Sequence, residues 1–379
     1  MGTSLKNDIP DMFLREFSEQ VDARRFLWRA YCANRIASSY LFAGPAGVGK
    51  FLVALQFIKF LKCSNRTDGE PCGECRSCRT IDVWDNPDIF IVFPMPSSVW
   101  NSDSRQEAYE EFRKSPYIMP AFKKASAILL PMIHEIQHFL STSATEGGGK
   151  FVLVPNAHKM NKSAANAFLK TLEEPPPGAH IFLSTDRPEA LLPTIRSRTQ
   201  IVRFRRLSTD SIVKHLVDRH SFAAESANMV ASLAEGSMAR ALLIASDEFQ
   251  QVRQQAVMLL KNAAQNNLTE VWEWATSAPA RLDYANSFMS AIMSMVRDVA
   301  VAATTKDTEK KLMLNIDYEK TIRGVAMRLQ SSSDALSLLN VLSSLYENLK
   351  RNPQYALFYN AVAAIIAGTF MRKNAPFTA

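Results

Sequence analysis

The stretch "GPAGVGKF" (44–51) constrains the fold more than any other part of the chain. Its glycines and lysine have the spacing of a phosphate-binding loop, G-x-x-x-x-G-K-[ST], except at the last position. The apolar run "SYLFAG" (39–44) precedes it, and "KFLVALQFIKFLK" (50–62) follows it with helical periodicity. A strand, a glycine-rich loop and a helix in this order predict an α/β P-loop domain built on a parallel sheet.

In such a loop, phosphates contact backbone N–H groups and the N-terminus of the following helix. Gly44, Gly47 and Gly49 shape the turn, and Lys50 adds a positive charge for the outer phosphates. The next position normally carries a hydroxyl that ligates Mg²⁺, but here it is Phe51. The loop therefore keeps its binding groups and lacks its metal ligand.

A hydrolase also needs acidic residues at the end of a neighbouring strand to hold the metal and the attacking water. The candidate strand "KFVLV" (150–154) is followed by Pro155 and Asn156, where two acids would be expected. Two independent losses predict that the chain has no ATPase activity of its own. Binding of ATP or ADP without turnover stays open.

Apolar runs at 87–94, 150–157 and 179–185 predict further strands of the same sheet. Between the first two, a polar segment interrupted by prolines predicts an insertion at about 95–131. Strand-like runs end near residue 206, and helical patterns continue to the last residue.

These changes predict three parts. They are an α/β domain over 1–206, a small helical segment over 207–245, and a helical domain over 246–379.

Composition indicates a globular protein, with 47% apolar and 21% charged residues. The net charge of +7 is compatible with nucleic-acid binding and equally with an ordinary basic surface. The apolar stretch at 356–371 contains Asn360 and is short for a membrane span, so we expect a buried helix. No secretory signal is visible at the N-terminus, and we expect a cytoplasmic protein without membrane contact.

Four of the five cysteines fall within 16 residues. Cys63, Cys72, Cys75 and Cys78 follow the pattern C-x8-C-x2-C-x2-C in a polar, turn-rich loop. Four thiolates are what tetrahedral Zn²⁺ requires, and they leave no ligand position open for catalysis. The pattern predicts a structural zinc site at 63–78; free thiols and an iron–sulfur cluster are the alternatives.

Three polar residues lie at the ends of predicted elements. Thr185 ends the strand at 179–185, where a hydroxyl can contact a terminal phosphate. Ser197 and Arg198 follow a short helical pattern and precede another strand. An exposed arginine there could pair with a surface carboxylate, or it could reach the nucleotide of a neighbouring subunit as an arginine finger.

Taken together, these features resemble a known family. "SYLFAGPAGVGK" (39–50), the four-cysteine insert and the segment 156–200, with its "LKTLEEPPP" and "LLPTIRSR" motifs, are similar to bacterial DNA polymerase III clamp-loader subunits. These are AAA+ proteins, and the likeness is greatest to the delta-prime type. It covers about residues 15–245, and the remaining helices match only in character.

The resemblance implies a RecA-like domain, a helical lid and a helical collar that joins five subunits into a ring. It implies that Ser197 positions Arg198 for a neighbour's ATP site and that Thr185 is the sensor residue of a degenerate nucleotide site. The family's Ser-Arg-Cys motif has Thr199 in third place here. In the lid, "GSMARA" puts Ala239 where motor subunits have an arginine, and Arg240 comes one residue later.

The resulting hypothesis is a non-hydrolysing subunit that supplies an arginine finger in trans. Its implied partners are gamma/tau motor subunits, a delta subunit, a sliding clamp and, through the complex, primed DNA during replication. One alternative is an active gamma/tau-like ATPase. The other is a zinc-stabilised nucleic-acid-binding module.

Overall fold

The computed structural model describes residues 9–10, 13–67, 69–122, 124–304, 313–351 and 354–371. The chain forms two compact units. One comprises Met1–Ile212 with Glu235–Arg240, and the other comprises Val213–Ala234 with Ala241–Ala379. The first is the α/β unit and the second is the helical unit. The division of the last part into a lid at 207–245 and a collar at 246–379 stays a prediction.

The α/β unit is built on five parallel strands in the order β2-β3-β4-β1-β5. Their bounds are Ser39–Ala43 (β1), Ile89–Ile91 (β2), Lys150–Val154 (β3), Ala179–Thr185 (β4) and Gln200–Arg203 (β5). Every residue of β1 and of β3 is buried, as expected for strands covered on both faces. The predicted α/β P-loop fold is therefore confirmed.

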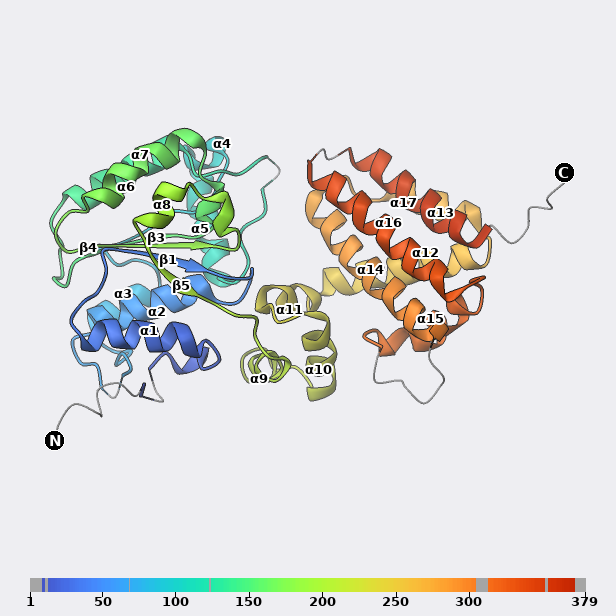
Figure 1. Cartoon of the computed structure of the whole chain (residues 1–379), viewed down its shortest axis with the longest axis horizontal. Helices are drawn as coiled ribbons and strands as arrows, with labels where there is room; N and C mark the ends of the chain where they lie inside the picture. The colour runs from blue at the N-terminus through green and yellow to red at the C-terminus, as the bar shows by residue number, and fades with distance from the viewer. Residues whose placement is uncertain are drawn as a thin grey trace. The chain divides into compact units, whose positions relative to one another are not determined.

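Helices cover both faces of this sheet (Figure 1). On one face lie α1 (Val21–Cys32), α2 (Lys50–Lys62) and α3 (Arg76–Asp82); on the other lie α6 (Leu130–Ser141), α7 (Lys162–Glu173) and α8 (Pro193–Ser197). The helix predicted over 50–62 has the bounds of α2. Because β1 lies between β4 and β5, the loop that leaves β1 starts level with the end of β4.

The insertion at about 95–131 contains two short helices, α4 (Ser97–Trp100) and α5 (Ser104–Lys114). The insertion contributes to the main core of the α/β unit. Trp100 and Ala108 are buried, and the Phe112 ring is completely buried. The sequence did not predict this burial, because most residues of α5 are polar and only one narrow face of the helix points inward.

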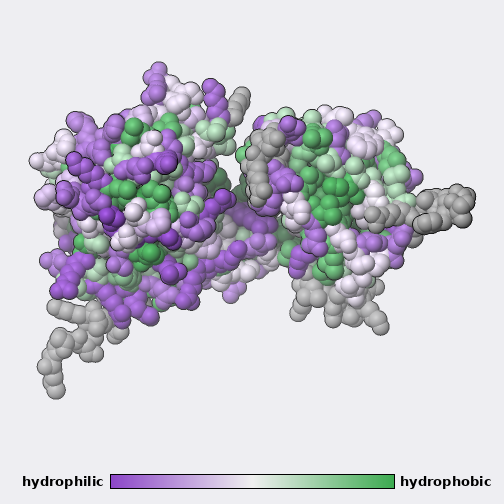
Figure 2. All heavy atoms as spheres, turned by 45° about the horizontal axis from the view of Figure 1, so that its top comes forward, coloured by the Kyte–Doolittle hydropathy of each residue, from purple (hydrophilic) through white to green (hydrophobic). Residues whose placement is uncertain are grey.

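The helical unit contains the end of α9 (Thr209–His220), α10 (Ala224–Leu233) and most of α11 (Met238–Ile244). Among the described residues, the helices that follow are α12 (Asp247–Ala264), α13 (Leu268–Ser277), α14 (Leu282–Thr304), α15 (Glu319–Ala326), α16 (Ser332–Arg351) and α17 (Tyr355–Met371). The buried helix predicted at 356–371 corresponds to α17. Figure 2 shows apolar side chains gathered on part of this unit's surface, and Leu336, Val341 and Leu357 are among its exposed apolar residues.

One helix within the described residues, over Tyr284–Thr304 of α14, is long and apolar enough to cross a membrane by length and composition alone. Half of that window is buried inside the protein, and α14 packs against α12, α15 and α16. Asp298 on α14 is fully buried and accepts hydrogen bonds from the backbone of Leu314 and Asn315. These contacts are those of a central helix in a bundle.

Candidate functional site

The glycine-rich loop connects β1 to α2 with the geometry of a phosphate-binding loop. Gly47 and Gly49 have φ angles of 72° and 88°, which glycine adopts without steric cost. Helix α2 begins at Lys50, with Gly49 as its N-terminal cap. The first N–H groups of α2 therefore face the loop, as an anion site requires.

The ammonium of Lys50 is turned back onto its own loop. Lys50 Nζ donates to the carbonyl oxygens of Gly44 (2.7 Å) and Pro45 (2.5 Å). Burial lowers the pKa of Lys50 to about 8, and the negative charge of Asp186 opposes that shift. The residue is only 8% exposed. The charge that would hold outer phosphates is thus engaged inside the protein.

A second contact covers the middle of the loop. The carbonyl oxygen of Gly47 accepts a hydrogen bond from the Met238 N–H at 2.9 Å. A Cβ at Gly47 would lie 2.2 Å from Ser237 Oγ and 2.6 Å from Ala239 Cβ, so only glycine fits there. The segment "GSMARA" therefore packs directly on the loop. Arg240 points to Glu235, with 2.9 Å between Nη1 and Oε2.

Phe51, at the position of the missing metal ligand, belongs to an aromatic cluster. Its ring centroid lies 4.9 Å from that of Phe112 on α5 and 5.1 Å from that of Trp84. Phe93 packs on Phe112 from the other side at 5.0 Å. Phe51 is only 6% exposed. At the sequence position where an active loop has a hydroxyl for Mg²⁺, this chain therefore has an apolar ring that packs on other rings.

The ends of β3 and β4 bring together three polar residues that the loop chemistry does not require. His158 Nδ1 lies 3.0 Å from Thr185 Oγ1 and 3.3 Å from Asp186 Oδ1. Burial lowers the pKa of His158, and Asp186 opposes that shift. The Thr185 hydroxyl also accepts the Arg187 N–H.

Sequence patterns singled out Thr185 but missed His158 and Asp186. Pro155 and Asn156 follow β3 as predicted, and Asn156 has a left-handed backbone. Of the two missed residues, Asp186 could have been predicted from the sequence, because it directly follows the end of a strand. It is the charged group that acts on Lys50.

Arg198 lies at the C-terminal end of α8 and is exposed. Its Nη2 is 2.7 Å from Glu173 Oε1, and its Nη1 donates to the Thr194 carbonyl oxygen at 3.1 Å. Glu173 is the last residue of α7, in the "LEEPPP" segment. Thr199 is buried and bonds to the Ile195 carbonyl oxygen, so it anchors the backbone after α8.

The four clustered cysteines converge. The Sγ atoms of Cys63, Cys72, Cys75 and Cys78 all lie within 4.8 Å of one another. An ion with Zn–S bonds of about 2.3 Å sets tetrahedral sulfurs about 3.8 Å apart, so small shifts would complete the site. Backbone N–H groups of Cys72 and Cys75 donate to neighbouring sulfurs, as expected for thiolate ligands. The set fits a structural metal.

The environment of the cysteines is uneven. Burial raises the pKa of Cys75, but hydrogen bonds from the backbone of Cys78 and Ser64 outweigh it and lower the value to about 6. Burial raises the pKa of Cys78. Glu146 ties the cluster to the loop before β3, through Ser77 (3.0 Å) and Arg76 (3.1 Å).

Half of this chain matches the sequence model of a known protein family. The sequence model for "DNA polymerase III, delta subunit" matches residues 19–208. The delta' subunit of DNA polymerase III from Bacillus subtilis is 28% identical over 246 residues, which are 65% of each chain. The delta' subunit from Pseudomonas aeruginosa is 33% identical over 162 residues, 43% of this chain and 41% of that protein. The matched part spans less than two thirds of each relative.

Similarity extends to a different subunit and to a solved structure. The tau subunit of DNA polymerase III from Bacillus subtilis is 28% identical over 221 residues, 57% of this chain and 34% of that protein. A gamma subunit-related protein from Thermotoga maritima superposes with a TM-score of 0.42 and 17% identity, over 90% of this chain and 99% of that one.

Proposed function

Because this chain belongs to the DNA polymerase III delta-subunit family and is a clamp-loader subunit of delta-prime type, we propose that it completes a neighbour's ATP site without hydrolysing ATP itself. Arg198 is the proposed arginine finger, and Ser197 positions it. The subunit would assemble with gamma/tau motor subunits and a delta subunit. The complex would then load a sliding clamp onto primed DNA in the cytoplasm.

The observation that carries this proposal is the contrast between Phe51 and Arg198. Phe51 has no hydroxyl to offer magnesium, and its ring is buried against Trp84 and Phe112. Arg198 is exposed at a helix end. Its ion pair with Glu173 joins two surface side chains, and such pairs contribute only about 0–1 kcal/mol, so another anion can replace the carboxylate.

We propose two further parts of the site. Cys63, Cys72, Cys75 and Cys78 would hold a structural Zn²⁺, which supplies a fixed tetrahedral crosslink to this loop. Gly44, Gly47, Gly49, Lys50 and Thr185 form a degenerate nucleotide site. Nucleotide binding there would require Lys50 to leave the Gly44 and Pro45 carbonyl oxygens.

The test is ATP turnover by the reconstituted complex. Arg198→Ala should lower the turnover rate by about a thousandfold, because arginine fingers contribute about 10³–10⁵ to kcat. The variant subunit should still fold and assemble. Arg113→Ala, which removes an exposed arginine from α5, is the matched control and should leave turnover unchanged. Unchanged turnover with Arg198→Ala would refute the finger assignment.

The active-ATPase alternative predicts a different result. The purified subunit alone would then hydrolyse ATP, and Lys50→Ala would abolish that activity. For the zinc-module alternative, the chain would not assemble with motor and delta subunits at all. Either outcome would replace the proposal.

A further inference from the structure

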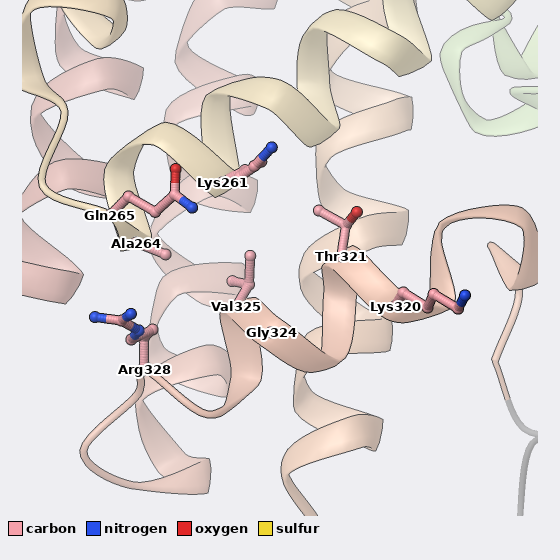
Figure 3. A pocket seen from close by; sticks show the side chains of 8 residues that line it. All are labelled: Lys261, Ala264, Gln265, Lys320, Thr321, Gly324, Val325 and Arg328. Carbon is pink, nitrogen blue, oxygen red and sulfur yellow. The ribbon is translucent and has the colours of Figure 1, made fainter.

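The helical unit contains a groove that the proposed function does not use. It lies between α12 and α15 and has a volume of about 310 Å³ (Figure 3). That volume is at the lower end of the range for ligand sites, about 300–1,000 Å³. Its lining residues are Lys261, Ala264, Gln265, Lys320, Thr321, Gly324, Val325 and Arg328.

Three of the lining residues are exposed cations. Lys261, Lys320 and Arg328 form no ion pair within the part of the chain that the structure describes. The two acids nearest Lys320 in sequence pair with other cations. Glu319 pairs with Arg323 at 3.0 Å, and Asp317 pairs with the buried Arg253 at 2.8 Å. The lining residues include no acid, so no carboxylate of the groove itself neutralises these charges.

The cations are spread along the groove. In Figure 3, Lys320 and Arg328 lie at opposite ends of the groove with their charged ends pointing away from each other, and Lys261 lies on α12. From Lys320 to the end of α15 at Ala326 the helix rises about 9 Å, at about 1.5 Å per residue, and Arg328 lies two residues beyond that end. A nucleic-acid strand carries one phosphate about every 3.4 Å along a B-form axis, so about three or four phosphates would span that length. The spacing fits a chain of phosphates better than a single phosphate.

The remaining lining residues suit backbone contact. Thr321 and Gln265 offer a hydroxyl and an amide, and nothing lies within 4 Å of the position where a Cβ would be on Gly324. None of the lining residues is aromatic, so the groove has no ring on which a base could stack. Recognition would go through phosphates, without a preference for sequence.

A purely structural role would explain only part of this charge. Lys261 lies in the last turn of α12, where a cation offsets the helix dipole. Lys320 lies in the first turn of α15, where a cation is unfavourable for the same reason. Helix stabilisation therefore does not account for Lys320.

We propose that this groove binds the phosphate backbone of a single nucleic-acid strand, with Lys261, Lys320 and Arg328 as the phosphate contacts. The site is separate from Arg198 and does not depend on the finger assignment. Because it lies within one compact unit, the purified subunit should show it.

The experiment uses the full chain, a fluorescent oligothymidylate and an anisotropy titration at several salt concentrations. The variant is Lys261→Ala/Lys320→Ala/Arg328→Ala, and its charge-matched control is Arg25→Ala/Lys114→Ala/Lys214→Ala. Loss of three phosphate contacts should make the slope of log Kd against log salt less steep by about 2, at about 0.7 per contact for single strands. Affinity at low salt should fall by about tenfold or more.

The proposal is overturned if the groove variant keeps the wild-type slope, or if the control variant changes as much. It is also overturned if an oligoglutamate peptide binds through these cations and oligothymidylate does not, since the ligand would then be an acidic protein segment. Arg198→Ala should bind oligothymidylate as the wild type does. That result keeps this test independent of the proposed ATPase role.

Discussion

The glycine-rich loop and the corner that carries Arg198 belong to the same α/β unit, but their charged groups are used differently. In the loop, the Lys50 ammonium donates to carbonyl oxygens of the loop itself, and Met238 covers Gly47. At the corner, Arg198 is exposed and contacts Glu173, the Thr194 carbonyl oxygen and the Ser197 hydroxyl. The Lys50 charge is bonded within the loop itself, whereas the Arg198 charge lies at the surface.

The residues of the loop motif and those of the corner contribute to the protein in different ways. The shape of the loop serves packing, because a side chain at Gly47 would collide with Ser237 and Ala239. Arg198 makes no comparable packing contribution to the core. We therefore expect substitutions in the loop region to act on stability and substitutions at the corner to act on the assembled complex.

The largest stability effect should come from loss of the proposed Zn²⁺. Cys63 directly follows α2, the helix whose other end forms the loop, so an ion on the cysteines would fix α2 at its far end. Cys75→Ser should abolish stoichiometric zinc and lower the free energy of unfolding on the order of several kcal/mol. Metal analysis and chemical denaturation measure the two effects, with Cys32→Ser as the control. Zinc-free wild-type protein of undiminished stability would contradict the site.

Phe51→Thr should have the next largest effect. It restores the hydroxyl of an active loop, but it empties space beside Trp84 and Phe112 and should cost about 3–5 kcal/mol. The variant should not hydrolyse ATP, because Pro155 and Asn156 still provide no acid. Denaturation and an ATPase assay of the isolated subunit test both points, with the half-buried Phe26→Thr as a milder control. ATP turnover by Phe51→Thr would contradict this comparison, because it would mean that a single substitution restores hydrolysis to the loop.

Glu173→Gln should have the smallest effect, and it sharpens the comparison at the corner. Loss of one partly exposed ion pair removes about 0–1 kcal/mol from the orientation of Arg198. The turnover rate of the assembled complex should change by about fivefold or less, with subunit stability unchanged. Glu174→Gln, at the exposed neighbouring position, should have no effect. A change as large as that of Arg198→Ala would mean that Glu173 itself takes part in the neighbour's site.

The regular parts of the α/β unit were predictable from local patterns. The bounds of β4 and α2 match the predicted ranges, because apolar runs and helical periodicity continue to the ends of these elements. The strand predicted at 87–94 is shorter and covers only Ile89–Ile91. Its last residues continue as buried backbone without strand geometry, a distinction that burial patterns cannot make.

The contacts that close the loop could not be predicted in this way. Phe51 was recognisable as a missing ligand, but its packing on Phe112 joins residues 61 positions apart and depends on how the insertion folds back. The ion pair between Glu173 and Arg198 likewise connects two separate helices. The motifs identified which side chains of an active loop are missing, and the three-dimensional packing shows what the residues in their place contact.

The partnership of Phe51 and α5 has a consequence for how such a chain changes over time. Without α5, the Phe51 and Trp84 rings would lose their Phe112 partner and meet water. With α5 but a small residue at 51, the unit would contain a void beside Phe112. A chain without α5 and a chain with a small residue at position 51 would both be less stable. We therefore expect related chains to have both the insertion and the phenylalanine, or neither. For the same reason, the segment at 95–131 is not one that can be trimmed to make a smaller protein.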